Sequence, residues 1–130
     1  MAHILIIEDD DGMRGSLAQT LERLGHQVSA AADGKQGVKS AVENRPDLVI
    51  TDLIMPEKEG LETITELRER HPGIKIIAMS GGGRLNNDDY LYMARKFGAA
   101  CTLAKPFSRE ELKAALAKAF QSGASPEGPA

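Results

Sequence analysis

Short apolar segments alternate with helical patterns along the chain, and this alternation constrains the fold more than any other feature of the sequence. Three of the segments are almost continuously apolar, which is typical of strands covered on both faces. The predicted strands are residues 3–7, 27–31, 47–51, 75–79 and 100–104. Strands that are each followed by a helix pair in parallel through right-handed crossovers. The sequence therefore predicts an α/β domain of three layers, with a doubly wound, five-stranded parallel sheet in the middle.

Five helices are predicted from apolar residues that recur three and four positions apart. We interpret Asp10 and Asp11 as acids that start the first helix, not as ligands, and Gly25 as its C-terminal cap. Ser108 and Glu111 form a capping box at the start of the last helix. The predicted apolar faces are Met13, Leu17, Leu21 and Leu24; Val38, Ala41 and Val42; Leu61, Ile64 and Leu67; Tyr90, Met93, Ala94 and Phe97; and Leu112, Ala115, Leu116, Ala119 and Phe120.

Length and composition set the class of protein. A chain of 130 residues predicts one domain, which we place at residues 1–120, followed by a small, polar, disordered tail at 121–130. Sixteen basic and nineteen acidic residues are interspersed and give a net charge of −3, which argues against nucleic-acid binding and against a basic membrane patch. No secretion signal or spanning segment is recognised, so we expect a cytoplasmic protein. Cys101 is interpreted as a buried, inert thiol.

Polar groups follow four of the five predicted strands. Glu8 and Asp9 follow the first strand, Asp52 the third, Ser80 the fourth and Lys105 the fifth. In a parallel sheet these strand ends share one edge, where ligands bind. Converging carboxylates repel one another and favour a cation, and Mg²⁺ suits such oxygen ligands. The hydroxyl and the ammonium group suit phosphoryl oxygens. We therefore predict a phosphoryl-transfer site in which one carboxylate attacks.

The same residues resemble the receiver domain of a two-component response regulator. The matching features are Glu8-Asp9 after "ILII", Asp52 in "DLIMP" with Gly60 behind it, Ser80, and Lys105-Pro106-Phe107. The resemblance covers residues 3–120. It implies a flavodoxin-like receiver fold with strand order 2-1-3-4-5.

The resemblance also implies a role for each acid. Asp52 would be the phosphoacceptor. Asp9 would bind Mg²⁺ directly, Glu8 would help to hold the ion through water, and Asp52 and the backbone carbonyl of Ile54 would complete the protein's metal ligands.

The remaining site residues are assigned in the same way. Ser80 would donate a hydrogen bond to the phosphoryl group and Lys105 would pair with it, across a cis Lys105–Pro106 bond. Thr102 stands where the family usually carries a tyrosine or phenylalanine, so we expect loop and helix movement, not a ring swing, to report phosphorylation.

The implied function is that of a stand-alone receiver, which phosphorylates and dephosphorylates itself and is not a conventional enzyme. Its phosphoryl donor would be a histidine kinase or a histidine phosphotransfer protein. A downstream protein would bind the face made by the fourth helix, strand five and the fifth helix. The resemblance leaves open whether the protein forms a weak homodimer, and neither nucleic acid nor membrane is expected as a partner.

Three alternatives remain at this point. A magnesium-dependent phosphohydrolase with an aspartate nucleophile usually carries a second aspartate two residues later, where this chain has Ile54. A phosphorelay intermediate would use the same site. A degenerate receiver that acts only as an interaction module is disfavoured by the intact acids, hydroxyl and lysine.

Overall fold

The computed structural model describes residues 2–52, 59–80 and 98–121, and within them the predicted sheet is confirmed. Its five parallel strands lie in the order β2-β1-β3-β4-β5, as the resemblance implied. The third and fourth strands each continue one residue beyond the predicted end, to Asp52 and Ser80. The strands are β1 His3–Ile7, β2 Gln27–Ala31, β3 Leu48–Asp52, β4 Lys75–Ser80 and β5 Cys101–Ala104.

Four of the predicted helices are described. They are α1 Asp11–Arg23, α2 Gly34–Asn44, α3 Glu59–Arg70 and α5 Arg109–Gln121. The fourth predicted helix, around residues 90–97, lies outside the described residues, as do residues 122–130 of the predicted tail. Gln121 was assigned to that tail and is instead the last residue of α5, because the helix continues one residue past Phe120.

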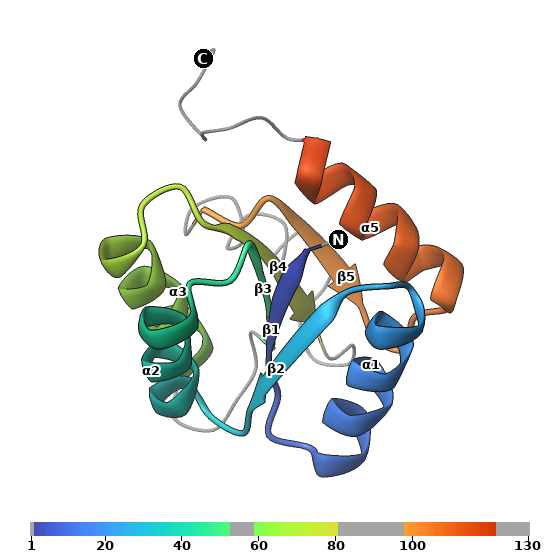
Figure 1. The fold of residues 1–130 in the computed structure, drawn as a ribbon, viewed down its shortest axis with the longest axis horizontal. Coiled ribbons are helices and arrows are strands. Elements are labelled where there is room, and N and C mark those ends of the chain that lie inside the picture. Colours follow the sequence, from blue (N-terminus) through green and yellow to red (C-terminus); the bar gives the residue numbers. More distant parts are fainter. Residues whose placement is uncertain (1, 53–58, 81–97, 122–130) are drawn as a thin grey trace.

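The helices cover both faces of the sheet, which gives the three predicted layers (Figure 1). Helices α1 and α5 lie on one face and α2 and α3 on the other. Successive strand residues point to opposite faces. Leu5 and Ile7 therefore pack with the α2–α3 side, whereas Ile4 and Ile6 pack with the α1–α5 side.

The predicted helix ends are confirmed by their hydrogen bonds. Asp10 is the N-cap of α1 and accepts a bond of 2.8 Å from the Met13 amide. The Ser108–Glu111 capping box forms both reciprocal bonds, of 2.8 and 3.0 Å. Gly25 has a φ of +97°, a conformation that glycine adopts without a steric penalty, just after the end of α1.

Val42 is a correction to the predicted apolar face of α2. Its side chain is 45% exposed. The buried face of α2 is formed by Gly34, Gly37, Val38 and Ala41. Since each residue turns the helix by about 100°, Val42 lies about a quarter turn from the centre of that face.

Strand register brings the ends of the strands to one edge. The last β1–β3 pair is Ile7 with Thr51, so Glu8 and Asp52 follow side by side. Asp52 in turn pairs with Met79, and Ser80 pairs with Ala104, the residue before Lys105. No helix in the described part of the chain is long and apolar enough to cross a membrane.

Candidate functional site

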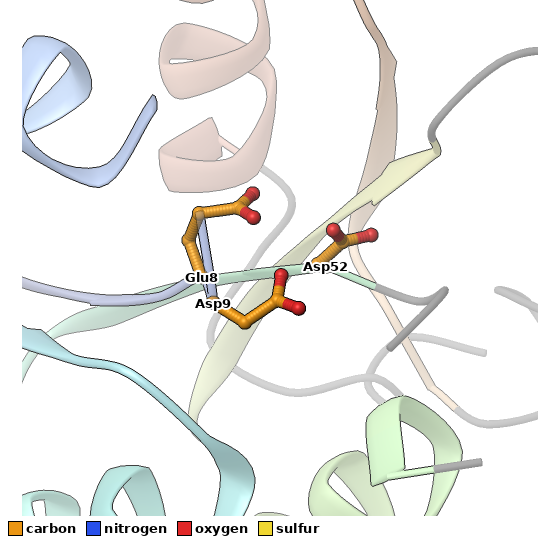
Figure 2. Close-up of side chains that lie close together, drawn as sticks. All are labelled: Glu8, Asp9 and Asp52. Atoms are coloured by element: carbon orange, nitrogen blue, oxygen red, sulfur yellow. The ribbon is translucent and has the colours of Figure 1, made fainter. Parts of the chain in front are cut away.

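Glu8, Asp9 and Asp52, here named the acid cluster, meet at the carboxyl edge of the sheet. One carboxylate oxygen from each lies within 4.8 Å of the others. Glu8 and Asp52 are buried, at 1% and 4% exposure, whereas Asp9 is exposed. Figure 2 shows the carboxylates of Glu8 and Asp9 turned toward Asp52. The side chains that were predicted from separate strand ends are thus brought together.

Lys105 joins two members of the acid cluster. Its Nζ donates hydrogen bonds to Glu8 Oε1 at 2.7 Å and to Asp52 Oδ2 at 2.9 Å. The Lys105–Pro106 peptide bond is cis, as predicted. The ammonium group therefore lies between the ends of β1 and β3, close to any group that binds Asp52.

Backbone hydrogen bonds fix Glu8 where β1 ends. The Glu8 amide donates to the Ala31 carbonyl at 3.1 Å, and the Glu8 carbonyl accepts from Arg14 Nη1 at 2.8 Å. The second carboxylate oxygen of Glu8 accepts from the Asp10 amide at 3.1 Å. Both ends of this buried residue are thereby oriented before any ligand binds.

Glu8, which is buried, and Lys105, which is half-buried, shift each other's pKa. Burial is the largest effect on Glu8 and raises its pKa, as does the charge of Asp52, while hydrogen bonds from Lys105 and the Asp10 amide oppose this increase. For Lys105, burial lowers the pKa, but the bonds to Glu8 and Asp52 and their charges together outweigh burial and raise it. Lys105 therefore stays charged at neutral pH.

The acid cluster fits a magnesium ion. Three carboxylates face one ammonium group, so with all acids ionised the cluster keeps net negative charge. Its ligand atoms are all oxygen, which Mg²⁺ prefers, and Asp9 is exposed, so that bound waters can be retained. Glu8, Asp9 and Asp52 are the described residues that could hold the ion.

The other predicted residues are Ser80, Ile54 and Thr102. Ser80 is the last residue of β4, at the same sheet edge as Asp52. Ile54, whose carbonyl was predicted as a ligand, lies outside the described residues. Thr102 lies in β5 and is half-buried.

Cys101 lies away from the acid cluster, near the start of β5. Its thiol is half-buried and donates to the Ala115 carbonyl at 3.5 Å. Burial raises the pKa of this thiol, and the charge of Lys118 opposes that effect. The thiol was predicted to be buried and is instead half-buried, and its inertness stays a prediction.

Two features of the site were missed in the sequence. Arg14 binds the Glu8 carbonyl, and the only local signal was its position three residues after Asp11 on a predicted helix. A groove of about 430 Å³ also lies between α1 and the loop after β5, and Met13, Leu17, Phe107 and Lys105 are among the residues that line it. Apolar periodicity assigned Met13 and Leu17 to the core and gave no sign of a groove.

Comparison with known proteins identifies the class. The family model described as "Response regulator receiver domain" matches residues 4–117. The chain therefore belongs to the receiver domain family of two-component signal transduction, whose members are signalling switches.

Individual relatives differ in how much of their length the chain represents. The chain is 32% identical over 115 residues to sporulation initiation phosphotransferase F of Bacillus subtilis, covering 88% of this chain and 90% of that protein. It is 34% identical over 125 residues to the DNA-binding transcriptional regulator NtrC of Azospirillum brasilense, covering 96% of this chain but 25% of that protein. The chain thus spans a quarter of one relative and nearly all of another.

Solved structures show the same fold. The chemotaxis protein CheY4 of Vibrio cholerae matches with a TM-score of 0.82 and 27% identity, covering 92% of this chain and 98% of that one. A receiver domain protein from Clostridium thermocellum matches with a TM-score of 0.83 and 30% identity, covering 92% and 94%. The sheet order and helix arrangement described above are those of this family.

Proposed function

We propose that Asp52 accepts a phosphoryl group from a histidine kinase or histidine phosphotransfer protein, in a reaction that requires Mg²⁺. The observation that carries this proposal is the pair of hydrogen bonds from Lys105 to Glu8 and Asp52, at 2.7 and 2.9 Å. These bonds place a cation beside Asp52, a buried aspartate at the end of a strand. Membership of the receiver family supports the same assignment.

In the proposed reaction a carboxylate oxygen of Asp52 attacks phosphorus. The new oxygen–phosphorus bond forms as the phosphorus–nitrogen bond of the donor's phosphohistidine breaks, and the electron pair returns to the imidazole ring. Glu8, Asp9, Asp52 and the Ile54 carbonyl would hold Mg²⁺, which would supply positive charge to offset the negative charge of the phosphoryl oxygens. Lys105 would move from Asp52 Oδ2 to a phosphoryl oxygen, and Ser80 would donate a hydrogen bond to another.

The groove between α1 and the loop after β5 is the proposed site for the donor's histidine-bearing helix. A phosphohistidine has to come within bonding distance of Asp52, and this groove is lined by Lys105 itself. Met13, Leu17 and Phe107 supply the apolar surface that a helix can bury.

The output is proposed to be protein binding at the face made by the fourth helix, β5 and α5. Of this face, β5 and α5 are described, and the fourth helix lies outside the described residues. The similarity to sporulation initiation phosphotransferase F, nearly all of which the chain covers, supports signalling by the receiver itself. DNA binding is named for the relative NtrC, and the match covers only 25% of that protein.

A phosphorelay role is the second candidate, because that Bacillus subtilis relative is named a phosphotransferase. For either role we propose that the receiver domain ends with α5. We also propose a cytoplasmic location, which family membership supports. A phosphorelay intermediate would pass its phosphoryl group on to a second histidine, whereas a terminal switch would lose it to water.

Intact-mass measurement after treatment with acetyl phosphate tests the site. One added phosphoryl group is expected with Mg²⁺ present and none with the metal chelated. Asp52→Asn should abolish the addition, and equal labelling of that variant would show that the acceptor is another residue. Phosphotransfer from a panel of histidine kinases and phosphotransfer proteins would then separate a terminal switch from a relay.

A further inference from the structure

Arg14 lies on α1 beside the acid cluster without binding its carboxylates. Its Nη1 donates to the backbone carbonyl of Glu8 at 2.8 Å, and its Nη2 pairs with the carboxylate of Asp11. Within residues 2–52, 59–80 and 98–121, no hydrogen bond joins its guanidinium to a carboxylate of the acid cluster. The side chain is 22% exposed, so most of it is packed against the protein.

The carbonyl that Arg14 binds belongs to the peptide group joining Glu8 to Asp9. This peptide lies beyond the last β1–β3 pair, Ile7 with Thr51. The sheet therefore holds the Glu8 amide, through Ala31, while the carbonyl of the next peptide accepts its bond from the Arg14 side chain. A rotation of this peptide would move the Asp9 carboxylate relative to Glu8 and Asp52.

Asp11 pairs with the other terminal nitrogen of the guanidinium. Asp11 and Arg14 are three residues apart on α1, a spacing that places them on one face of the helix. One nitrogen of the guanidinium is thereby held by the helix and another by the strand end. The Arg14 guanidinium thus connects the first turn of α1 to the peptide between Glu8 and Asp9, two of the proposed metal ligands.

We propose that Arg14 is a positioning residue for the magnesium site, which it serves by holding the Glu8–Asp9 peptide so that both carboxylates face Asp52. The inference rests on the proposed function, because it concerns the ion that phosphoryl transfer to Asp52 requires. Groups that orient metal ligands without touching the ion contribute about 10- to 100-fold to metal affinity. Arg14 acts in that way through a main-chain carbonyl.

Coulomb's law alone predicts that removing Arg14 changes the Mg²⁺ affinity in the opposite direction. Removing a positive charge near three carboxylates should strengthen the binding of a cation. Positioning predicts that removing Arg14 weakens it. If Arg14 served only to stabilise the fold, its removal would lower the melting temperature and leave the affinity of the folded protein for Mg²⁺ unchanged or tighter.

The test is titration calorimetry with MgCl₂ on the full chain at constant ionic strength. Arg14→Met removes the donor and the charge and keeps a long side chain, and the expected result is at least about tenfold weaker binding. Arg14→Lys keeps the charge and one possible donor and should recover part of this loss. Arg23→Met is the matched control, since it removes the same charge from the last turn of α1, about 13 Å further along the helix.

Phosphorylation by acetyl phosphate at increasing Mg²⁺ gives a second readout. Arg14→Met should require at least about tenfold more Mg²⁺ for half-maximal rate and approach the wild-type rate at saturation. Equal or tighter Mg²⁺ binding by folded Arg14→Met overturns the inference. If that variant does not fold, Arg14→Gln takes its place with the same expectation and the same contrary outcome.

The controls separate this inference from the function on which it rests. A wild-type chain that neither binds Mg²⁺ nor takes up phosphoryl would remove the proposed function and the inference together. A wild-type chain that does both, with Arg14→Met unaffected, removes only the role of Arg14. Equal weakening in Arg23→Met would show that the effect does not depend on the bond to the Glu8 carbonyl and would also overturn the inference.

Discussion

Lys105 Nζ lies 2.7 Å from Glu8 Oε1, so the loop after β5 is joined to the end of β1 across the intervening strands. The same ammonium group reaches Asp52, and it is the shared counter-charge of both buried acids. This relationship offsets part of the repulsion between Glu8 and Asp52 and leaves Lys105 close enough to transfer its hydrogen bond to a phosphoryl group.

Replacing Lys105 with methionine should destabilise the metal-free protein by about 2 kcal/mol, because two buried acids lose their charged donor. Mg²⁺ should recover more stability in Lys105→Met than in wild type, since the ion then becomes the main counter-charge. Thermal unfolding with Mg²⁺ and with a chelator measures both effects. Lys105→Arg keeps the charge and is the control. Equal stabilisation of Lys105→Met and wild type by Mg²⁺ would contradict the expected exchange of counter-charge.

Alkaline pH should remove the contribution of Lys105 to stability. Although burial alone would lower its pKa, the bonds and charges of Glu8 and Asp52 raise the pKa above the ordinary value of 10.5. The folded state thus retains the proton more strongly than the unfolded state, so this contribution is complete below 10.5 and is lost as the pH rises through the folded value. Urea unfolding across this pH window should show a steeper loss of unfolding free energy for wild type than for Lys105→Met. Parallel curves for the two proteins would count against a contribution from Lys105.

Magnesium affinity should fall on acidification at a higher pH than for an ordinary glutamate. Burial, and then the charge of Asp52, raise the pKa of Glu8 above 4.5 against the opposing effect of its hydrogen bonds. A protonated carboxyl does not hold the ion, so binding releases a proton once the pH approaches that raised value. Calorimetry in two buffers of different ionisation enthalpy measures the release. Glu8→Gln should bind more weakly and release fewer protons, and unchanged proton release would refute the role of Glu8.

Adding a methyl group at Gly37 should destabilise the protein by about 1–2 kcal/mol. A Cβ there would lie 2.3 Å from Ile7 Cδ1 and 2.6 Å from Ile7 Cγ1, and Ile7 is fully buried. Overpacking of this kind costs about 1–3 kcal/mol and exceeds the gain of up to about 1 kcal/mol from replacing a helical glycine.

Gly15→Ala provides the matched control for Gly37→Ala. Gly15 is exposed in α1, and a Cβ at this position would meet no atom within 4 Å. This substitution should therefore stabilise the protein by about 0.5–1 kcal/mol. Urea unfolding measures both variants, and destabilisation of similar size in the two would show that packing against Ile7 is not the cause.

Cys101 should react with iodoacetamide several-fold more slowly in the folded protein than in urea. Burial raises the pKa of the thiol, which lowers the thiolate fraction near pH 8, and the thiolate is the reactive form. The charge of Lys118 opposes this shift, so Lys118→Gln should slow the reaction further. Mass spectrometry over time follows the alkylation. If the folded wild-type chain reacted as fast as the unfolded one, burial would not protect the Cys101 thiol.

The sequence by itself determined the order of the elements and the edge at which the acids meet. Continuous apolar runs and apolar stripes of period 3.6 are local signals, and stripe residues such as Leu17 and Leu112 are buried in the core as these signals predict. The caps Asp10 and Ser108 are also local, because each bonds an amide three residues away. Parallel pairing then placed Glu8, Asp52 and Lys105 at one edge without reference to any distance.

Only the tertiary structure decided which of these groups touch. Lys105 bonds Glu8 as well as Asp52 because strand register and the path of the chain after β5 bring together residues that are far apart in sequence. Packing of α2 on β1 likewise decided that Gly37 meets Ile7 and that Val42 is exposed. Arg14 reaches a carbonyl on another element, and a backbone acceptor leaves no mark in the residue types. Contacts of this kind depend on three-dimensional distance, which local periodicity does not encode.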